Sequence, residues 1–201
     1  MFKLKCNKTL ILLLISICII ALTSCSNQSS AKHPQVQFEM ENGDNMVFEL
    51  YPEYAPETVS NFISLTEDGF YNGLTFHRIM KGFMIQGGDP DGNGMGGSGK
   101  TIKGEFSTNG FTKNRLSHTK GVISMARNGA DMDSASSQFF IMHGDNTVLD
   151  GSYAAFGKLV SGEETLDKIA DTPVTASDLD PDEMSKPTET VKIKSVIVLN
   201  K

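Results

Sequence analysis

The segment "FHRIMKGFMIQGGD", residues 76–89, contains two apolar runs around a central Lys-Gly pair, which predicts a β-hairpin. If the turn centres on Gly82, Arg78 lies opposite Gln86, and side chains that oppose each other project to the same face. Met80 and Met84 share that face, because side chains alternate along a strand. The opposite face is expected to carry His77, Ile79, Phe83 and Ile85. A guanidinium and an amide beside two thioethers suit the floor of a binding groove better than a core.

Short strands dominate the chain on both sides of this hairpin. Alternating runs flank Asn42-Gly43 and predict a second hairpin. A helix is predicted from Pro56, and a second helix over residues 161–172 with Ser161 as its cap and Glu164 three residues later. Further strand candidates are "GVISMA", "SQFFIMH", "YAAFGKLV" and "VKIKSVIVL". About eight strands and two helices favour a closed antiparallel barrel or a sandwich.

The first 24 residues have the pattern of an export signal. Three lysines precede an apolar run at residues 9–22, which is too short for a comfortable transmembrane helix. "LTSC", residues 22–25, resembles a bacterial lipobox, in which Cys25 becomes lipidated after cleavage. An uncleaved anchor helix or an ordinary signal peptide is the alternative. We therefore expect a signal peptide at 1–24, the lipidated cysteine and a flexible tether at 25–34, and an extracytoplasmic location on the bacterial cell membrane.

Cysteine usage and charge agree with an exported domain. Cys6, Cys18 and Cys25 are the only cysteines, so residues 26–201 contain neither a thiol nor a disulfide. Without the three leader lysines the chain has 15 Lys and Arg against 24 Asp and Glu, a net charge of −9. Such an acidic domain argues against nucleic-acid binding.

Three stretches in register resemble the cyclophilin-type peptidyl-prolyl isomerases. They are the opening segment, "LSHTKGVISMAR" at 116–127, and "SSQFFIM" with "VLDGSYAAFGKL" at 136–159. The resemblance covers about residues 35–201, which we expect to form the isomerase domain. It implies a mainly β fold, a closed eight-stranded antiparallel barrel capped by two helices.

The resemblance also assigns roles to individual residues. Arg78 matches the catalytic arginine and Gln86 the glutamine beside it. The matches to the apolar pocket that holds the proline ring are Phe83, Met84, Phe140 and Leu149. The matches to other substrate-binding positions are His77, Gly94, Ala126, Arg127, Gln138, Val148 and Tyr153. On strand alternation, Phe139 is expected in the core and Phe140 in the groove.

The implied activity is acceleration of X–Pro bond rotation during the folding of exported proteins, with proline-containing segments of unfolded proteins as partners. It needs no metal and no cofactor. The alternatives are a non-catalytic chaperone that binds proline segments and an envelope lipoprotein on the same fold. Arg78 is expected to be open to solvent without a buried partner, and the acidic stretch 178–183 to be a solvated loop rather than a calcium site. Val148 replaces the tryptophan that contacts the cyclic peptide cyclosporin, so weak cyclosporin binding is expected.

Overall fold

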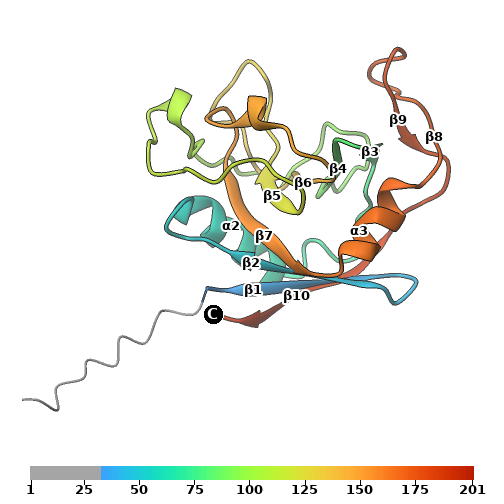
Figure 1. Ribbon diagram of the computed structural model, residues 1–201, viewed down its shortest axis with the longest axis horizontal. Coiled ribbons are helices and arrows are strands. Elements are labelled where there is room, and N and C mark those ends of the chain that lie inside the picture. Colours follow the sequence, from blue (N-terminus) through green and yellow to red (C-terminus); the bar gives the residue numbers. More distant parts are fainter. Residues whose placement is uncertain (1–32) are drawn as a thin grey trace, which may run out of the picture. The chain divides into compact units, whose positions relative to one another are not determined.

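The computed structural model describes residues 33–201, so the predicted signal peptide, the lipidation site at Cys25 and most of the tether lie outside the described residues. One antiparallel sheet forms the body of this part, in the order β10-β1-β2-β7-β5-β6-β4-β3 (Figure 1). Its strands are β1 (Gln35–Met40), β2 (Asn45–Leu50), β3 (Arg78–Met80), β4 (Met84–Gly87), β5 (Val122–Met125), β6 (Phe139–Met142), β7 (Ala155–Ser161) and β10 (Ile193–Asn200). A separate hairpin pairs β8 (Val174–Ala176) with β9 (Met184–Pro187).

The sheet curls but its two end strands do not pair with each other. β10 and β3 are the two edge strands of the sheet. The segment before β3 meets the start of β10 locally, through an isolated bridge between Thr75 and Lys192 and through backbone hydrogen bonds that include a pair between Ile193 and residues 73 and 74, both 2.8 Å. The mainly β class, with eight strands and two helices, is confirmed, but closure of the barrel is not. The three-residue β3 is too short to continue the ladder, and β9 packs against it instead.

Both predicted hairpins are present, and the one around Gly82 has the predicted register. Around Gly43, β1 pairs with β2 from Gln35 opposite Glu49 to Glu39 opposite Asn45. Around Gly82, β3 pairs with β4 and places Arg78 directly opposite Gln86. Gly82 has a φ of +82°, a left-handed conformation that glycine adopts without steric cost.

The first helix is confirmed and its N-terminus is capped from a distant loop. α2 (Pro56–Glu67) begins at the predicted proline and buries Val59 and Phe62. Its N-terminal amides have no local side-chain cap. Instead the buried carboxylate of Glu105 accepts hydrogen bonds from the amides of Glu57 (3.0 Å) and Thr58 (2.8 Å). A carboxylate at this position is favourable, because a helix N-terminus carries partial positive charge.

The second helix is shorter than predicted. α3 (Glu163–Ala170) has Gly162, not Ser161, at its N-cap, so the predicted serine cap was wrong. Ser161 is the last residue of β7 and pairs with Val47 of β2. Gly162 then turns the chain with a φ of +92°, where an added Cβ would lie 2.1 Å from the Asn45 carbonyl oxygen. Only glycine fits this tight passage from strand to helix.

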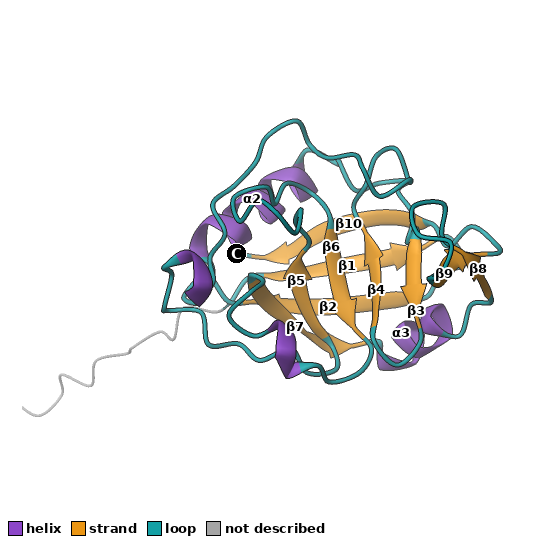
Figure 2. Cartoon of the chain, turned by 90° about the horizontal axis from the view of Figure 1, so that it is seen from above, coloured by secondary structure: helices purple, strands orange, loops and turns teal. Residues whose placement is uncertain are grey.

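The core lies inside the curled sheet, where α2 packs against β10 and α3 against β2, β3 and β4 (Figure 2). Its centre is a set of fully buried aromatic rings that includes Phe38, Phe62, Tyr71 and Phe139. Phe62 stacks on Tyr71 with 4.8 Å between ring centroids. None of the helices between residues 33 and 201 has the length and apolar character that a membrane crossing requires.

The acidic stretch is the solvated loop that the sequence predicts, with residues 178–182 exposed, but Glu183 at its end is half-buried. Residues 177–183 connect β8 to β9, and the hairpin they form lies beside β3 at one end of the sheet (Figure 2). Within the connection, the Ser177 amide donates to the Glu183 carbonyl at 2.8 Å, and the Glu183 amide donates to the Asp180 carbonyl at 3.0 Å. The hairpin is therefore an ordered wall next to Arg78.

Candidate active site

Arg78 is the polar centre of the site, and β3 and β4 bring its expected neighbours around it. Nη1 lies 3.4 Å from Gln86 Oε1 and 3.6 Å from the Met84 sulfur. Nη2 lies 3.2 Å from the Met80 sulfur. The predicted shared face of these four residues is confirmed.

A chain of side-chain amides orients Gln86 toward the guanidinium. Gln138, just before β6, uses Nε2 to donate to the carbonyls of Gly94 (3.1 Å) and Gly96 (2.8 Å). Its Oε1 therefore faces Gln86 and accepts from Gln86 Nε2 at 2.9 Å. This leaves Gln86 Oε1, the acceptor, directed at Arg78. The glycine-rich loop at residues 89–99, called the glycine loop below, thus fixes the glutamine pair, and the pair supports Nη1.

Glu183 makes the shortest contacts to the guanidinium, and the sequence did not predict them. Its Oε1 accepts from Arg78 Nε and its Oε2 from Nη2, both at 2.6 Å. The Ser185 hydroxyl also donates to Oε1 at 2.6 Å. The Arg78 guanidinium, together with this hydroxyl, outweighs the effect of burial and lowers the pKa of Glu183 to about 2. Arg78 therefore has a charged partner, and the expectation that it has none was wrong.

A cavity of about 210 Å³ with a largely apolar lining opens beside Arg78. Its lining comprises Arg78, Phe83, Met84, Gln86, Ala126, Arg127, Phe140, Leu149 and Tyr153. All four residues matched to the proline pocket are therefore together. Phe83 belongs to this pocket and not to the core face that strand alternation predicted, because it lies in the turn before β4 rather than in the strand.

Aromatic contacts shape the far side of this cavity. Phe139 is fully buried in the main core, whereas Phe140 points into the cavity, as alternation predicts. The Tyr153 ring meets Phe140 edge-on at 5.6 Å, and the guanidinium of Arg127 lies 4.8 Å from the Tyr153 ring centroid. Arg127 also donates from Nε to the Ser152 carbonyl at 3.0 Å. Its side chain is thus part of the wall.

A second cavity, of about 330 Å³, adjoins the first. Its lining comprises Gln86, Gly94, Met95, Gly96, Ala126, Arg127, Asn128, Gly129, Ser134, Ser136 and Gln138. Ala126, Arg127 and Gln86 border both cavities, so the two form one groove between β4 and the segment that follows β5. A groove with one apolar end and one polar end suits an extended peptide with a single apolar anchor.

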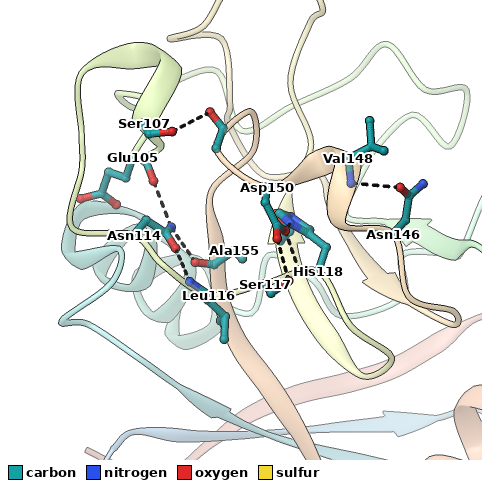
Figure 3. Close-up of polar contacts among 12 residues, drawn as sticks. Glu105, Ser107, Asn114, Leu116, Ser117, His118, Asn146, Val148, Asp150 and Ala155 are labelled. Carbon is teal, nitrogen blue, oxygen red and sulfur yellow. Dashed lines mark hydrogen bonds and ion pairs between the residues drawn. The ribbon is translucent and has the colours of Figure 1, made fainter.

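A polar cluster around the buried His118, which the sequence did not single out, supports Phe140. The Asp150 carboxylate accepts hydrogen bonds from the Ser117 hydroxyl (2.6 Å) and from the His118 backbone amide (2.8 Å). His118 Nδ1 lies 2.8 Å from the same carboxylate (Figure 3). The His118 ring stacks on Phe140 with an interplanar angle of 16°. Burial lowers the pKa of His118, although Asp150 opposes this effect. The motifs "LSHT" and "VLDG", which supplied the resemblance, contain this cluster.

Two residues matched to substrate-binding positions lie outside these cavities. Val148 is 86% exposed in the short 3-10 helix at Thr147–Leu149, where its amide donates to Asn146 Oδ1 (Figure 3). His77 lines a third cavity of about 240 Å³, between the Gly92–Gly94 loop and the β8–β9 hairpin. Within residues 33–201 neither of its buried ring nitrogens has a hydrogen-bond partner. Burial lowers the pKa of His77.

Comparisons with known proteins agree with this geometry. The family model of cyclophilin-type peptidyl-prolyl cis-trans isomerases matches residues 35–198. Peptidyl-prolyl cis-trans isomerase B of Bacillus subtilis is 50% identical over 127 residues, which cover 63% of this chain and 84% of the relative. A peptidyl-prolyl cis-trans isomerase of Helicobacter pylori is 46% identical over 130 residues, which cover 64% and 76%.

A solved structure has the same fold. The crystal structure of a cyclophilin-type peptidyl-prolyl cis-trans isomerase from Cryptosporidium parvum, determined in the presence of the dipeptide Ala-Pro, superposes with a TM-score of 0.71 at 32% identity. It covers 83% of this chain and 99% of its own. Fold, groove and relatives lead to one conclusion: the chain belongs to the cyclophilin-type peptidyl-prolyl cis-trans isomerases.

Proposed function

We propose that Arg78 is the catalytic group of this isomerase and that Gln86 keeps Nη1 directed at the substrate. Rotation of an X–Pro bond breaks amide resonance, against a barrier of about 18–20 kcal/mol. In the twisted transition state the proline nitrogen gains a lone pair that the planar ground state lacks. A guanidinium N–H directed at this nitrogen stabilises the transition state selectively, which is the requirement for catalysis.

The observation that carries this proposal is the position of Nη1. It is the guanidinium nitrogen with the longest contacts, 3.4 Å to Gln86 and 3.6 Å to Met84, and both of these neighbours line the apolar cavity. A proline ring held in the apolar cavity would present its nitrogen to this donor. The preceding residues would lie along Ala126 and Arg127 in the adjoining cavity. Rotation then needs neither a nucleophile nor a proton transfer.

We propose further that the domain acts outside the cytoplasm, on exported proteins, from a lipid anchor on Cys25. The support is the sequence of the leader, with three lysines, an apolar run at residues 9–22 and "LTSC". Diacylglycerol supplies two acyl chains, which is enough for stable anchoring where one chain would be marginal. Uncatalysed isomerisation takes tens to hundreds of seconds, so an isomerase at the membrane would accelerate a slow folding step.

Two experiments test these proposals. Nuclear magnetic resonance exchange between cis and trans forms of an X–Pro peptide should accelerate in the presence of the chain from residue 26. The absence of acceleration would favour a non-catalytic proline-binding module. Cys25→Ala should move the full-length chain from the membrane to the soluble fraction without changing its activity on the peptide. Membrane retention of this variant would favour an uncleaved anchor helix.

A further inference from the structure

The guanidinium of Arg78 has two edges with different partners. The edge formed by Nε and Nη2 has two 2.6 Å bonds to Glu183. Among residues 33–201, Nη1 has only the long contacts to Gln86 and Met84. Paired parallel bonds between arginine and a carboxylate fix the plane of the guanidinium as well as its position. The fork to Glu183 therefore determines where Nη1 points.

Glu183 is itself held in place by the β8–β9 hairpin. Its backbone bonds to Ser177 and Asp180, and its side chain accepts from Ser185, which is only 1% exposed. β9 packs against β3, the strand that begins with Arg78. Both partners of the ion pair are thus attached to ordered, adjacent strands. Their side chains are only 30% (Arg78) and 22% (Glu183) exposed, which limits screening by water.

The hairpin reaches Arg78 from the side that faces away from the proline pocket. No residue of 174–187 lines the apolar cavity. The hairpin residues Ser177, Asp178, Leu179, Ser185 and Lys186 line the third cavity, on the other side of Arg78. The ion pair is therefore compatible with a bound proline, and it does not block the groove.

We propose that Glu183 is a positioning residue for catalysis: it holds the Nε–Nη2 edge of Arg78 and leaves Nη1 for the reacting nitrogen of the substrate. This inference rests on the isomerase activity and on Arg78 as its catalytic group. A carboxylate also lowers the positive potential of the guanidinium, so the gain from orientation must exceed that loss. The two effects predict opposite changes when the carboxylate is replaced, which makes the proposal testable.

The decisive variant is Glu183→Gln, which keeps the size of the side chain and removes the charged fork. We expect kcat to fall roughly 10-fold, since a misplacement of about 1 Å at a catalytic group can cost about 100-fold and Gln86 still supports Nη1. KM should stay within about twofold, because the pocket and the groove do not contain Glu183. Asp182→Asn is the matched control: it makes the same charge change at the neighbouring, exposed residue and should leave kcat unchanged.

A double-mutant cycle distinguishes positioning from a general structural effect. In an Arg78→Ala background, Glu183→Gln should change the remaining kcat by less than about twofold, because its target is gone. A loss of stability alone would lower activity in both backgrounds. If Glu183→Gln fails to fold, Ser185→Ala removes one of the three bonds to the carboxylate and should lower kcat about two- to threefold.

All variants are compared as the full-length chain in detergent, with exchange on an X–Pro peptide over a range of substrate concentrations. Equal or higher kcat for Glu183→Gln than for wild type would overturn the positioning role, and higher kcat would identify the ion pair as inhibitory. An equal loss of kcat in both backgrounds would also overturn it. An inactive wild type would instead refute the isomerase activity itself, so the two failures are distinguishable.

Discussion

Replacing Arg78 by alanine should remove most of the isomerase activity. The variant loses Nη1, the pre-organised donor beside the apolar pocket. Removal of one such donor from a site of developing charge costs about 2.7–4 kcal/mol, or about 100-fold to 1,000-fold in rate. The Arg78 side chain is 30% exposed, so water screens part of the effect. We therefore expect the lower end of this range, roughly a 100-fold decrease in kcat/KM.

The same substitution should also reduce stability, because Glu183 then has only the Ser185 hydroxyl as a side-chain partner. In the wild type the pKa of Glu183 falls from 4.5 to about 2. A carboxyl with a lowered pKa stabilises the folded state above its unfolded pKa, and this contribution disappears as the pH falls through the folded value. With partial exposure taken into account, we expect a loss of about 1–3 kcal/mol at pH 7. Most domains tolerate such a loss.

The assay is peptide exchange at the proline, with circular dichroism to confirm the fold and urea unfolding to measure the loss of stability. Arg78→Lys serves as a control, since it keeps the charge but not the planar fork of donors, and should recover less than about 10-fold of the lost activity. A folded Arg78→Ala variant with kcat/KM within about threefold of wild type would refute the mechanism. An unchanged free energy of unfolding would refute the importance of the ion pair for stability.

Two further predictions concern ligand choice and pH. Wild type should be poorly inhibited by cyclosporin and Val148→Trp should be sensitised, since an absent aromatic contact and hydrogen bond cost on the order of 2–4 kcal/mol. Inhibition titrations of both proteins measure this difference, and near-stoichiometric inhibition of the wild type would contradict it. Lowering the pH from 7.5 to 5.5 should decrease the free energy of unfolding, because burial lowers the pKa of His77 and His118 from 6.5 and the unfolded chain then binds more protons. The slope should reach up to about 1.4 kcal/mol per pH unit for each histidine, and His77→Asn should reduce it in urea unfolding. An unchanged slope in that variant would contradict the assignment.

Local patterns predicted the parts of the site that lie within one hairpin. Opposition of Arg78 and Gln86 follows from the turn at Gly82, because antiparallel pairing fixes the register once the turn is known. The same rule separates Phe139 from Phe140 on β6. Alternation failed for Phe83, since the turn extends one residue beyond the point where the sequence suggests that the strand begins. Side chains alternate between the two faces of a sheet only within the strand itself.

Local sequence patterns did not predict the contacts between segments that are far apart in the chain. Glu105 caps α2 across 48 residues, and Glu183 reaches Arg78 across 105. In the sequence, Glu183 is one of four acidic residues between 178 and 183, and charge alone does not distinguish it from the other three. What distinguishes it is the packing of β9 against β3, which brings this one carboxylate to the guanidinium.

The ion pair also explains how an acidic domain keeps a cation at its groove. A free arginine side chain samples several rotamers, and a catalytic donor must occupy one of them. In this chain the glutamine pair, which is bonded to the glycine loop, supports Nη1. Glu183, which belongs to the β8–β9 hairpin, holds Nε and Nη2. The two supports come from different segments of the chain, and both segments line the third cavity beside His77. Orientation of Arg78 therefore depends on the hairpin, and sequence changes that displace Glu183 or Ser185 should alter the rate of isomerisation without touching the proline pocket.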